Sequence, residues 1–120
     1  MSHIVTIATK VQDFAAIRAA CQRLNLAPPS QGTAKLFSGE ATGLLVQLPD
    51  WRYPLVIDTQ TGEIRFDDFE GTWGNRVQLD RFLQCNAAER VKLEAHKKGY
   101  AVSEQTLQDG SIRIQLSERS

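Results

Sequence analysis

Apolar and polar positions repeat with two different periods along the chain, and these periods predict strands and helices. Residues 3–9 alternate loosely and are rich in β-branched side chains, which favours a strand almost at the first residue. After Asp13, apolar residues recur at steps of three and four, so residues 14–25 are predicted to form an amphipathic helix that Asp13 caps. Pro28 and Pro29 keep this helix from continuing.

The middle of the chain contains short apolar runs separated by turn residues. Residues 31–43 are rich in Gly, Ser and Thr, which predicts one weak strand between mobile turns. Residues 44–48 and 55–58 are predicted to be antiparallel neighbouring strands. Residues 63–67 predict a half-exposed strand, because apolar Ile64 and Phe66 alternate with charged Glu63, Arg65 and Asp67.

Residues 76–98 contain neither Gly nor Pro, and their apolar stripe predicts one long helix. Gly99 is its expected C-terminal stop. A second interpretation breaks this helix at Asn86, which could cap a new segment with Glu89 three residues further on. Both interpretations place a helix directly before the C-terminal strands.

The C-terminal residues predict a β-hairpin. Residues 100–107 and 111–116 flank Gln108-Asp109-Gly110, and Asp-Gly is a strong turn signal between alternating strands. The element order is then β-α-β-β-β-β-α-β-β. This order predicts an α+β fold in which a single, mostly antiparallel sheet carries both helices on one face. Residues 1–120 are predicted to form a single domain, because a chain of this length builds one core.

Composition excludes several function classes. Fourteen Lys and Arg balance fourteen Asp and Glu, so no long-range field attracts nucleic acid or an anionic membrane. No apolar run has the length of a signal peptide or a membrane span, so a cytoplasmic location without a membrane partner is expected. Cys21 and Cys85 lack the paired spacing of zinc or redox sites and are interpreted as small buried hydrophobic side chains.

Four strings of residues, taken in order, resemble a known family. They are Met1-Ser2-His3 leading to Ile7 and Thr9, Tyr53-x-Leu55-Val56-x-Asp58, Gly99-Tyr100-x-Val102, and Asp109-Gly110-Ser111-Ile112. Together they span nearly the whole chain, which in this combination resembles the hypothetical chloroplast reading frame thirty-five family, a domain of unknown function in plastids, cyanobacteria and other bacteria. The family has no established activity, so the resemblance implies a small intracellular domain and transfers no catalytic residue.

The resemblance also implies an AAA-type ATPase as a candidate partner, because bacterial relatives are often encoded near one. Two features depart from the family pattern. The family usually carries an aromatic residue near the middle of the long helix, where this chain has Asn86, and the hairpin around Thr61-Gly62 looks like an insertion. A surface built from these two regions need not be shared with the family.

Acidic residues gather at Asp67-Asp68-Phe69-Glu70, and Asp58 ends the preceding strand in a position to approach them across the hairpin. Hard cations prefer several oxygen ligands of this kind, and His3 could add an imidazole. One hypothesis is therefore a metal-dependent or small-ligand enzyme that uses His3, Asp58 and Asp67. The competing interpretation is a solvated polar loop, with His3 only tying down the N-terminus. No cofactor is expected.

Large aromatic residues stand in the predicted loops around the central strands. Such residues either close over an edge of the core or form a surface for a partner. Because they cluster in sequence, they are the candidate partner-binding residues: Trp51, Tyr53, Phe69 and Trp73.

The long helix also carries six basic residues, which allows weak nucleic-acid binding as an alternative function: Arg76, Arg81, Arg90, Lys92, Lys97 and Lys98. Asp80, Glu89 and Glu94 interrupt them, as on a solvated helix with charge pairs. No phosphate-binding glycine loop, zinc-protease motif, nucleophile elbow or dinucleotide fingerprint occurs in the sequence. The leading hypothesis is a non-enzymatic accessory or adaptor domain that binds another protein through its loop aromatics and a sheet edge.

Overall fold

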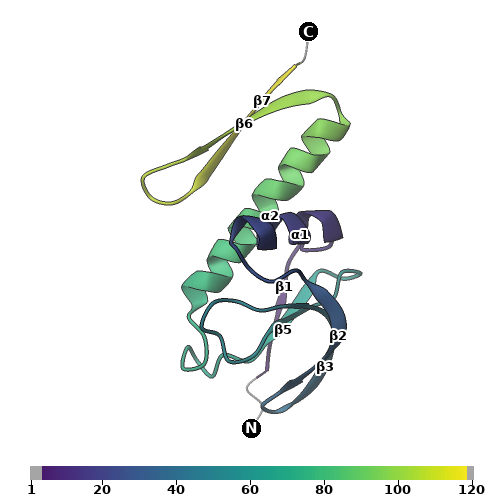
Figure 1. The fold of residues 1–120 in the computed structure, drawn as a ribbon, viewed down its shortest axis with the longest axis vertical. Helices are drawn as coiled ribbons and strands as arrows, with labels where there is room; N and C mark the ends of the chain where they lie inside the picture. The colour runs from purple at the N-terminus through teal and green to yellow at the C-terminus, as the bar shows by residue number, and fades with distance from the viewer. Residues whose placement is uncertain (1–3, 119–120) are drawn as a thin grey trace.

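The computed structural model describes residues 4–118, and its elements follow the predicted order. Five strands form one antiparallel sheet in the spatial order β1-β5-β4-β3-β2 (Figure 1). They are β1 (Val5–Ala8), β2 (Ser30–Leu36), β3 (Gly39–Val46), β4 (Leu55–Ile57) and β5 (Glu63–Phe66). His3 lies outside the described residues.

Two helices follow the predicted boundaries closely. In α1 (Phe14–Arg23), the Asp13 Oδ1 accepts a hydrogen bond from the Ala15 backbone N–H at 2.9 Å, which caps the helix as expected. The second helix, α2 (Arg76–Lys97), is capped by Asn75 and is followed by Gly99 at a φ of +81°. It runs unbroken through Asn86, so the alternative interpretation of two segments is wrong. Neither helix has the combination of length and apolar character that crossing a membrane requires.

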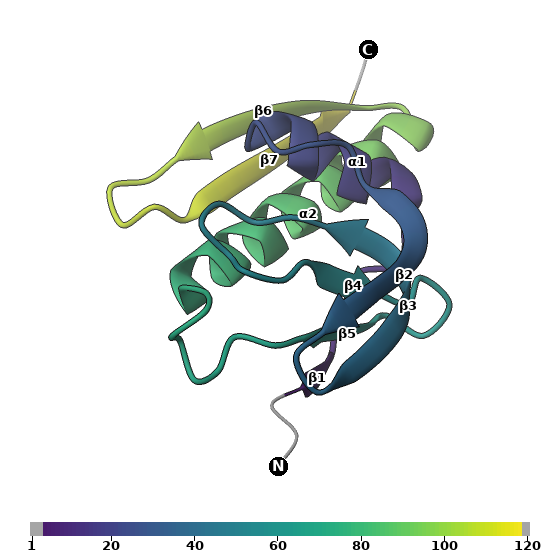
Figure 2. The same ribbon diagram turned by 60° about the horizontal axis from the view of Figure 1, so that its bottom comes forward.

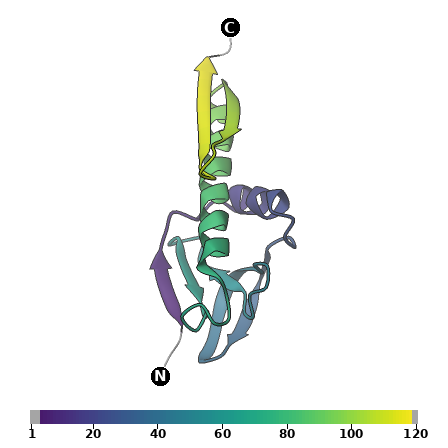
Figure 3. The same ribbon diagram turned by 90° about the vertical axis from the view of Figure 1, so that its left-hand side faces the viewer.

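The main core lies between one face of the five-stranded sheet and both helices, which confirms the predicted helix placement. Strand residues of alternating position point into it, among them Val46, Leu55, Ile64 and Phe66, and each of these is fully or almost fully buried. The helices supply Ile17, Ala20 and Cys21 from α1, and Leu79, Phe82 and Cys85 from α2. Figures 2 and 3 show both helices on the same side of this sheet. Burial of Cys21 and Cys85 confirms their interpretation as core side chains.

Residues 31–43 are more regular than the sequence predicted. They belong to the β2–β3 hairpin, in which every residue from Ser30 to Leu36 has a partner in β3. Its buried side chains Ala34, Leu36 and Ala41 form, with Val56 of β4, a second, smaller core on the other face of the sheet. The glycines of this segment made the strands look weak in the sequence. Gly43 is required by the sheet itself, because a Cβ there would lie 2.5 Å from the Ile57 carbonyl oxygen.

The C-terminal hairpin departs from the predicted single sheet. Strands β6 (Tyr100–Thr106) and β7 (Ile112–Glu118) pair only with each other among the described residues. The reason is the length of α2, because its 22 residues carry the chain about 33 Å away from the sheet before β6 begins. The hairpin therefore packs on the C-terminal half of α2, at the top of Figure 1, and the molecule measures 57 × 31 × 23 Å.

Candidate functional site

The loop between β5 and α2 has an unusual backbone. Phe69 and Glu70 have φ values of +44° and +53°, and Gly71 follows at +95°. Non-glycine residues rarely adopt this left-handed conformation, and such strain concentrates at functional sites. The Asp68 carbonyl stabilises the loop by accepting hydrogen bonds from Gly71 N at 3.0 Å and Trp73 N at 2.9 Å. The strained turn projects the Phe69 ring outward while the chain returns to place Trp73 beside it.

Three aromatic side chains surround Trp73, and the four residues come from three loops. Its ring centroid lies 4.8 Å from that of Phe69 in a stacked arrangement, 5.1 Å from Phe37 and 5.6 Å from Tyr53. The Arg52 guanidinium lies 5.1 Å from the Trp73 ring centre, within cation–π range. We refer to Phe37, Arg52, Tyr53, Phe69 and Trp73 as the aromatic cluster.

The aromatic cluster is both exposed and firmly held. Phe37 and Phe69 keep 60% and 39% of their surface accessible, although apolar side chains of this size are usually buried. The Arg52 backbone N–H donates to the Trp73 carbonyl at 2.8 Å, which joins the two loops that carry most of the cluster. The rings are therefore presented by fixed backbone, so little conformational entropy remains to be lost when a partner covers them.

Trp51 does not belong to this surface. Only 5% of it is exposed, its ring contacts Phe66 edge-on, and its Nε1 donates to the Asn75 carbonyl at 3.1 Å. Gly74 lies directly under the ring, with no room for a Cβ. The loop 50–54 thus turns one aromatic side chain into the core and the next aromatic, Tyr53, toward the aromatic cluster.

The two aspartates after β5 are buried rather than solvated, which corrects the interpretation of this segment as a solvated polar loop. Asp67 and Asp68 are 0% and 1% exposed, whereas Glu70 is exposed. Asp68 Oδ2 accepts a hydrogen bond from Arg76 Nε at 2.5 Å, but Asp68 Oδ1 and both carboxylate oxygens of Asp67 have no hydrogen-bond partner. The Asp68–Arg76 pair therefore holds the root of the strained loop from inside.

The residues of the predicted metal site do not converge. Asp58 and Asp67 lie at opposite ends of β5. The Asp58 backbone N–H donates to the carbonyl of Glu63, the first residue of β5, whereas Asp67 follows its last residue, Phe66. Four residues of strand separate those ends by about 13 Å. Asp58 instead closes the β4–β5 turn by accepting from Gln60 N at 2.9 Å. No group of three His, Cys, Asp or Glu side chains suited to a metal ion occurs within residues 4–118.

Ion pairs occupy several of the basic residues on α2. Arg76 pairs with Asp68, Lys97 with Glu94 at 3.7 Å, and Lys92 with both Glu89 and Glu104 at 3.0 Å. Positive charge is thereby balanced locally along much of the helix, as a solvated helix with charge pairs requires.

Sequence reasoning missed Phe37 and Arg52 as members of the aromatic cluster. The sequence predicts a weak strand around Phe37, whereas the structure places this residue in the turn between β2 and β3. Arg52 sits between two aromatic residues in sequence, but only the folded loop brings it over Trp73. No family model matches the sequence, and it has no significant similarity to any curated protein or solved structure.

Proposed function

We propose that this protein is a non-enzymatic accessory or adaptor domain that binds another protein through the aromatic cluster. The observation that carries the proposal is the exposure of Phe37 and Phe69 beside Trp73, with Phe69 on a strained, hydrogen-bonded loop. Tyr, Trp and Arg side chains dominate the binding energy of protein interfaces, because they offer a large apolar area together with a polar group. Tyr53, Trp73 and Arg52 form such a set here.

Strain in the loop supports the same conclusion. Phe69 and Glu70 hold left-handed backbone conformations that a loop with no task beyond connecting β5 to α2 does not need. Asp68 and Arg76 fix the root of the loop at the expense of burying a carboxylate. Backbone strain and a buried carboxylate both lower the stability of this loop. Their occurrence together supports a need to hold the aromatic side chains in one arrangement.

The partner class follows from the sequence resemblance described above. The chloroplast reading frame thirty-five family implies an AAA-type ATPase as partner. In the proposed complex, the aromatic cluster contacts that ATPase. Binding of this kind does not require any ionisable side chain of the domain to react.

The test compares three serine variants: Phe37→Ser, Phe69→Ser and, as a matched control, Phe14→Ser. Phe14 is also an exposed phenylalanine, at 51%, but it lies at the start of α1 and outside the aromatic cluster. Each protein is expressed with an affinity tag in its native host, cross-linked, and recovered for mass spectrometry. An AAA-type ATPase of the same host is also tested in purified form.

We expect one protein, recovered with the native chain and with Phe14→Ser, to be lost with both cluster variants. Loss of an aromatic anchor costs about 2 kcal/mol or more, which is at least a tenfold weaker affinity. A captured protein that remains bound equally to all four chains would refute the proposed role of the cluster.

A further inference from the structure

Within the described residues, β7 has an unpaired edge at a distance from the aromatic cluster. β7 has β6 as its only neighbour in the described part of the chain, so one of its edges is unpaired. Every second residue of an antiparallel strand directs its N–H and C=O toward that edge. The register with β6 is continuous over seven residue pairs, and no bulge twists the edge away. Proteins usually protect such an edge, because it is a template for another strand.

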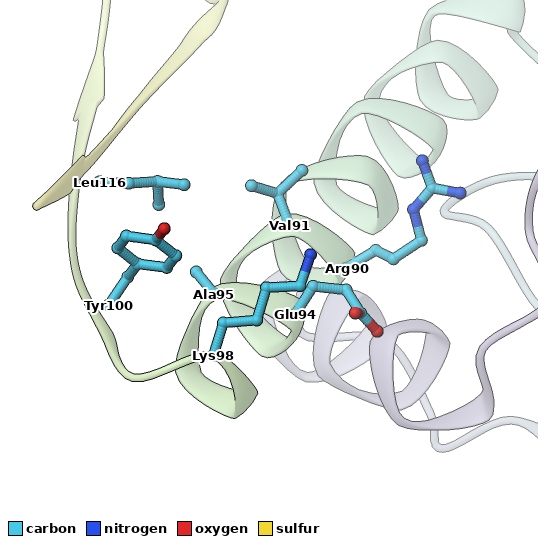
Figure 4. Close-up of a pocket in the computed structure, with 7 residues that line it drawn as sticks. All are labelled: Arg90, Val91, Glu94, Ala95, Lys98, Tyr100 and Leu116. Atoms are coloured by element: carbon cyan, nitrogen blue, oxygen red, sulfur yellow. The ribbon is translucent and has the colours of Figure 1, made fainter. Parts of the chain in front are cut away.

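A groove beside this strand exposes apolar side chains. Two adjoining cavities of about 270 and 570 Å³ share Val91 and lie between α2 and the hairpin. The helix wall carries Ala87, Val91 and Ala95 at intervals of four, with charged Arg90, Glu94 and Lys98 beside them at the larger cavity. The strand wall carries Ile112, Ile114 and Leu116 at intervals of two. Figure 4 shows Leu116 and Tyr100 facing Val91 and Ala95 across the larger cavity. Val91 and Leu116 remain 38% and 49% exposed, so both walls are incompletely covered.

The sequence of β7 is complementary to itself. Its inward face reads Ile112, Ile114, Leu116, which is nearly symmetric about Ile114. If two copies pair antiparallel with a two-fold axis at Ile114, then Ile112 of each copy lies opposite Leu116 of the other. On the outward face, Arg113 lies opposite Gln115 of the other copy, so no like charges meet.

Helix packing agrees with the same axis. α2 lies beneath the hairpin and contacts both β6 and β7. Two hairpins joined through β7 form a four-stranded sheet in which the centres of the hairpins are two strand spacings apart, about 9.6 Å. Helices pack at about 8–10 Å, so each α2 would lie against the α2 of the other copy. The α2 helix of the second copy would then cover the exposed part of each Val91 side chain.

We infer that the protein forms a two-fold homodimer in which the free edges of β7 pair antiparallel about Ile114 and the α2–hairpin groove is closed by the second copy. Pairing of the two β7 edges makes each hairpin one half of a four-stranded sheet, so the backbone groups along these edges gain hydrogen-bond partners. The aromatic cluster remains free, because α2 places Asn75 and Val91 about 24 Å apart along its axis. A dimer would therefore present two aromatic clusters to its partners.

The experiment uses two substitutions at one exposed residue. Gln115→Glu places a carboxylate opposite Arg113 of the second copy, twice by symmetry, whereas Gln115→Arg places like charges there. Within one chain Gln115 pairs with Ser103, so neither substitution changes a charge pair inside the hairpin. Both proteins, with the native chain, are examined by sedimentation equilibrium across concentrations up to about 1 mM, where even weak self-association is populated.

We expect the native chain to dimerise, Gln115→Glu to tighten the dimer about tenfold and Gln115→Arg to weaken it about tenfold. High salt should reduce the difference between the two variants. Val91→Glu should weaken the dimer as well, and Phe37→Ser should leave it unchanged, which separates this interface from the aromatic cluster. A native chain that stays monomeric throughout overturns the inference. A dimer whose affinity is the same for both Gln115 variants, or that Phe37→Ser disrupts, overturns it too.

Discussion

The Arg76 Nε donates to the Asp68 Oδ2 at 2.5 Å, and this ion pair joins the first residue of α2 to the root of the strained loop. The two partners differ sharply in environment, since the Asp68 side chain is 1% exposed and the Arg76 side chain 50%. The guanidinium also lies 4.6 Å from the centre of the Phe66 ring, so it covers the core as it neutralises the carboxylate. The ion pair therefore connects the loop that carries Phe69 and Trp73 to the start of α2.

Removal of this arginine should destabilise the protein strongly. Arg76→Ala leaves the Asp68 carboxylate buried without a counter-charge, and breaking such a pair costs about 3 kcal/mol. Chemical denaturation followed by circular dichroism measures the free energy of unfolding. Lys97→Ala, which breaks an exposed pair with Glu94, is the control and should change it by at most about 0.5 kcal/mol.

A double variant separates the charge effect from lost packing over Phe66. If the unpaired carboxylate is the main cost, Arg76→Ala should destabilise the Asp68→Asn protein much less than it destabilises the native chain. Equal costs in the two backgrounds would mean that the ion pair contributes little and that packing dominates.

Gly74 is required for the position of Trp51. A Cβ at Gly74 would overlap the Trp51 ring, so Gly74→Ala should displace the ring and cost about 2 kcal/mol of unfolding free energy. Gly32→Ala is the matched control, because its Cβ would meet only Leu45 Cδ1 at an ordinary 3.6 Å. The tryptophan emission spectrum should shift to the red for Gly74→Ala alone. Equal stability of the two variants contradicts this account of the loop.

The hairpin is attached to the helices by a network of charges. Glu104 of β6 pairs with Arg23 of α1 and, at 3.0 Å, with Lys92 of α2, while Glu89 contacts both cations. Burial disfavours ionisation of Glu104, but hydrogen bonds from Arg23 and Lys92 outweigh it and hold the pKa of this carboxyl below its ordinary value of 4.5. The ionised form is thus the one that stabilises the fold.

The pH dependence follows from that direction. A carboxyl with a lowered pKa in the folded state contributes stability above its unfolded pKa, and the contribution is lost as pH falls through the folded value. Glu104→Gln should therefore be less stable than the native chain by about 1 kcal/mol at neutral pH, and this difference should shrink below about pH 4.5. Hydrogen exchange should locate the effect in β6 and β7. A difference that is independent of pH would exclude an electrostatic origin.

The two cysteines should resist modification in the folded protein. Burial raises the pKa of the Cys21 thiol from 9.0 to about 11, and it is also the main cause of a raised pKa for Cys85. Neither thiol therefore forms the reactive thiolate at neutral pH. A chromogenic disulfide reagent should titrate both thiols in denaturant and neither of them in buffer. Rapid reaction of either cysteine in buffer contradicts its placement in the core.

The sequence determined the features that depend on a few neighbouring residues. Asp13 caps α1 through the N–H of the residue two positions on, and Gly110 adopts a φ of +87° at the predicted hairpin turn. The apolar stripe of α2 outweighs a single Asn86, because one polar residue costs less than ending a helix and starting another. Such local preferences are encoded within one or two turns of chain, so they can be identified without knowledge of the fold.

Tertiary structure alone decided which side chains reach the surface. Trp51 and Trp73 both stand in loops, yet the first is buried over Gly74 and the second meets Phe69 of its own loop and Phe37 and Tyr53 of two others. Asp67 and Asp68 look like a solvated run but are enclosed by the packing of β5 and α2. Burial depends on contacts between segments tens of residues apart, and hydrophobic periodicity within one segment carries no information about which distant segment will cover it.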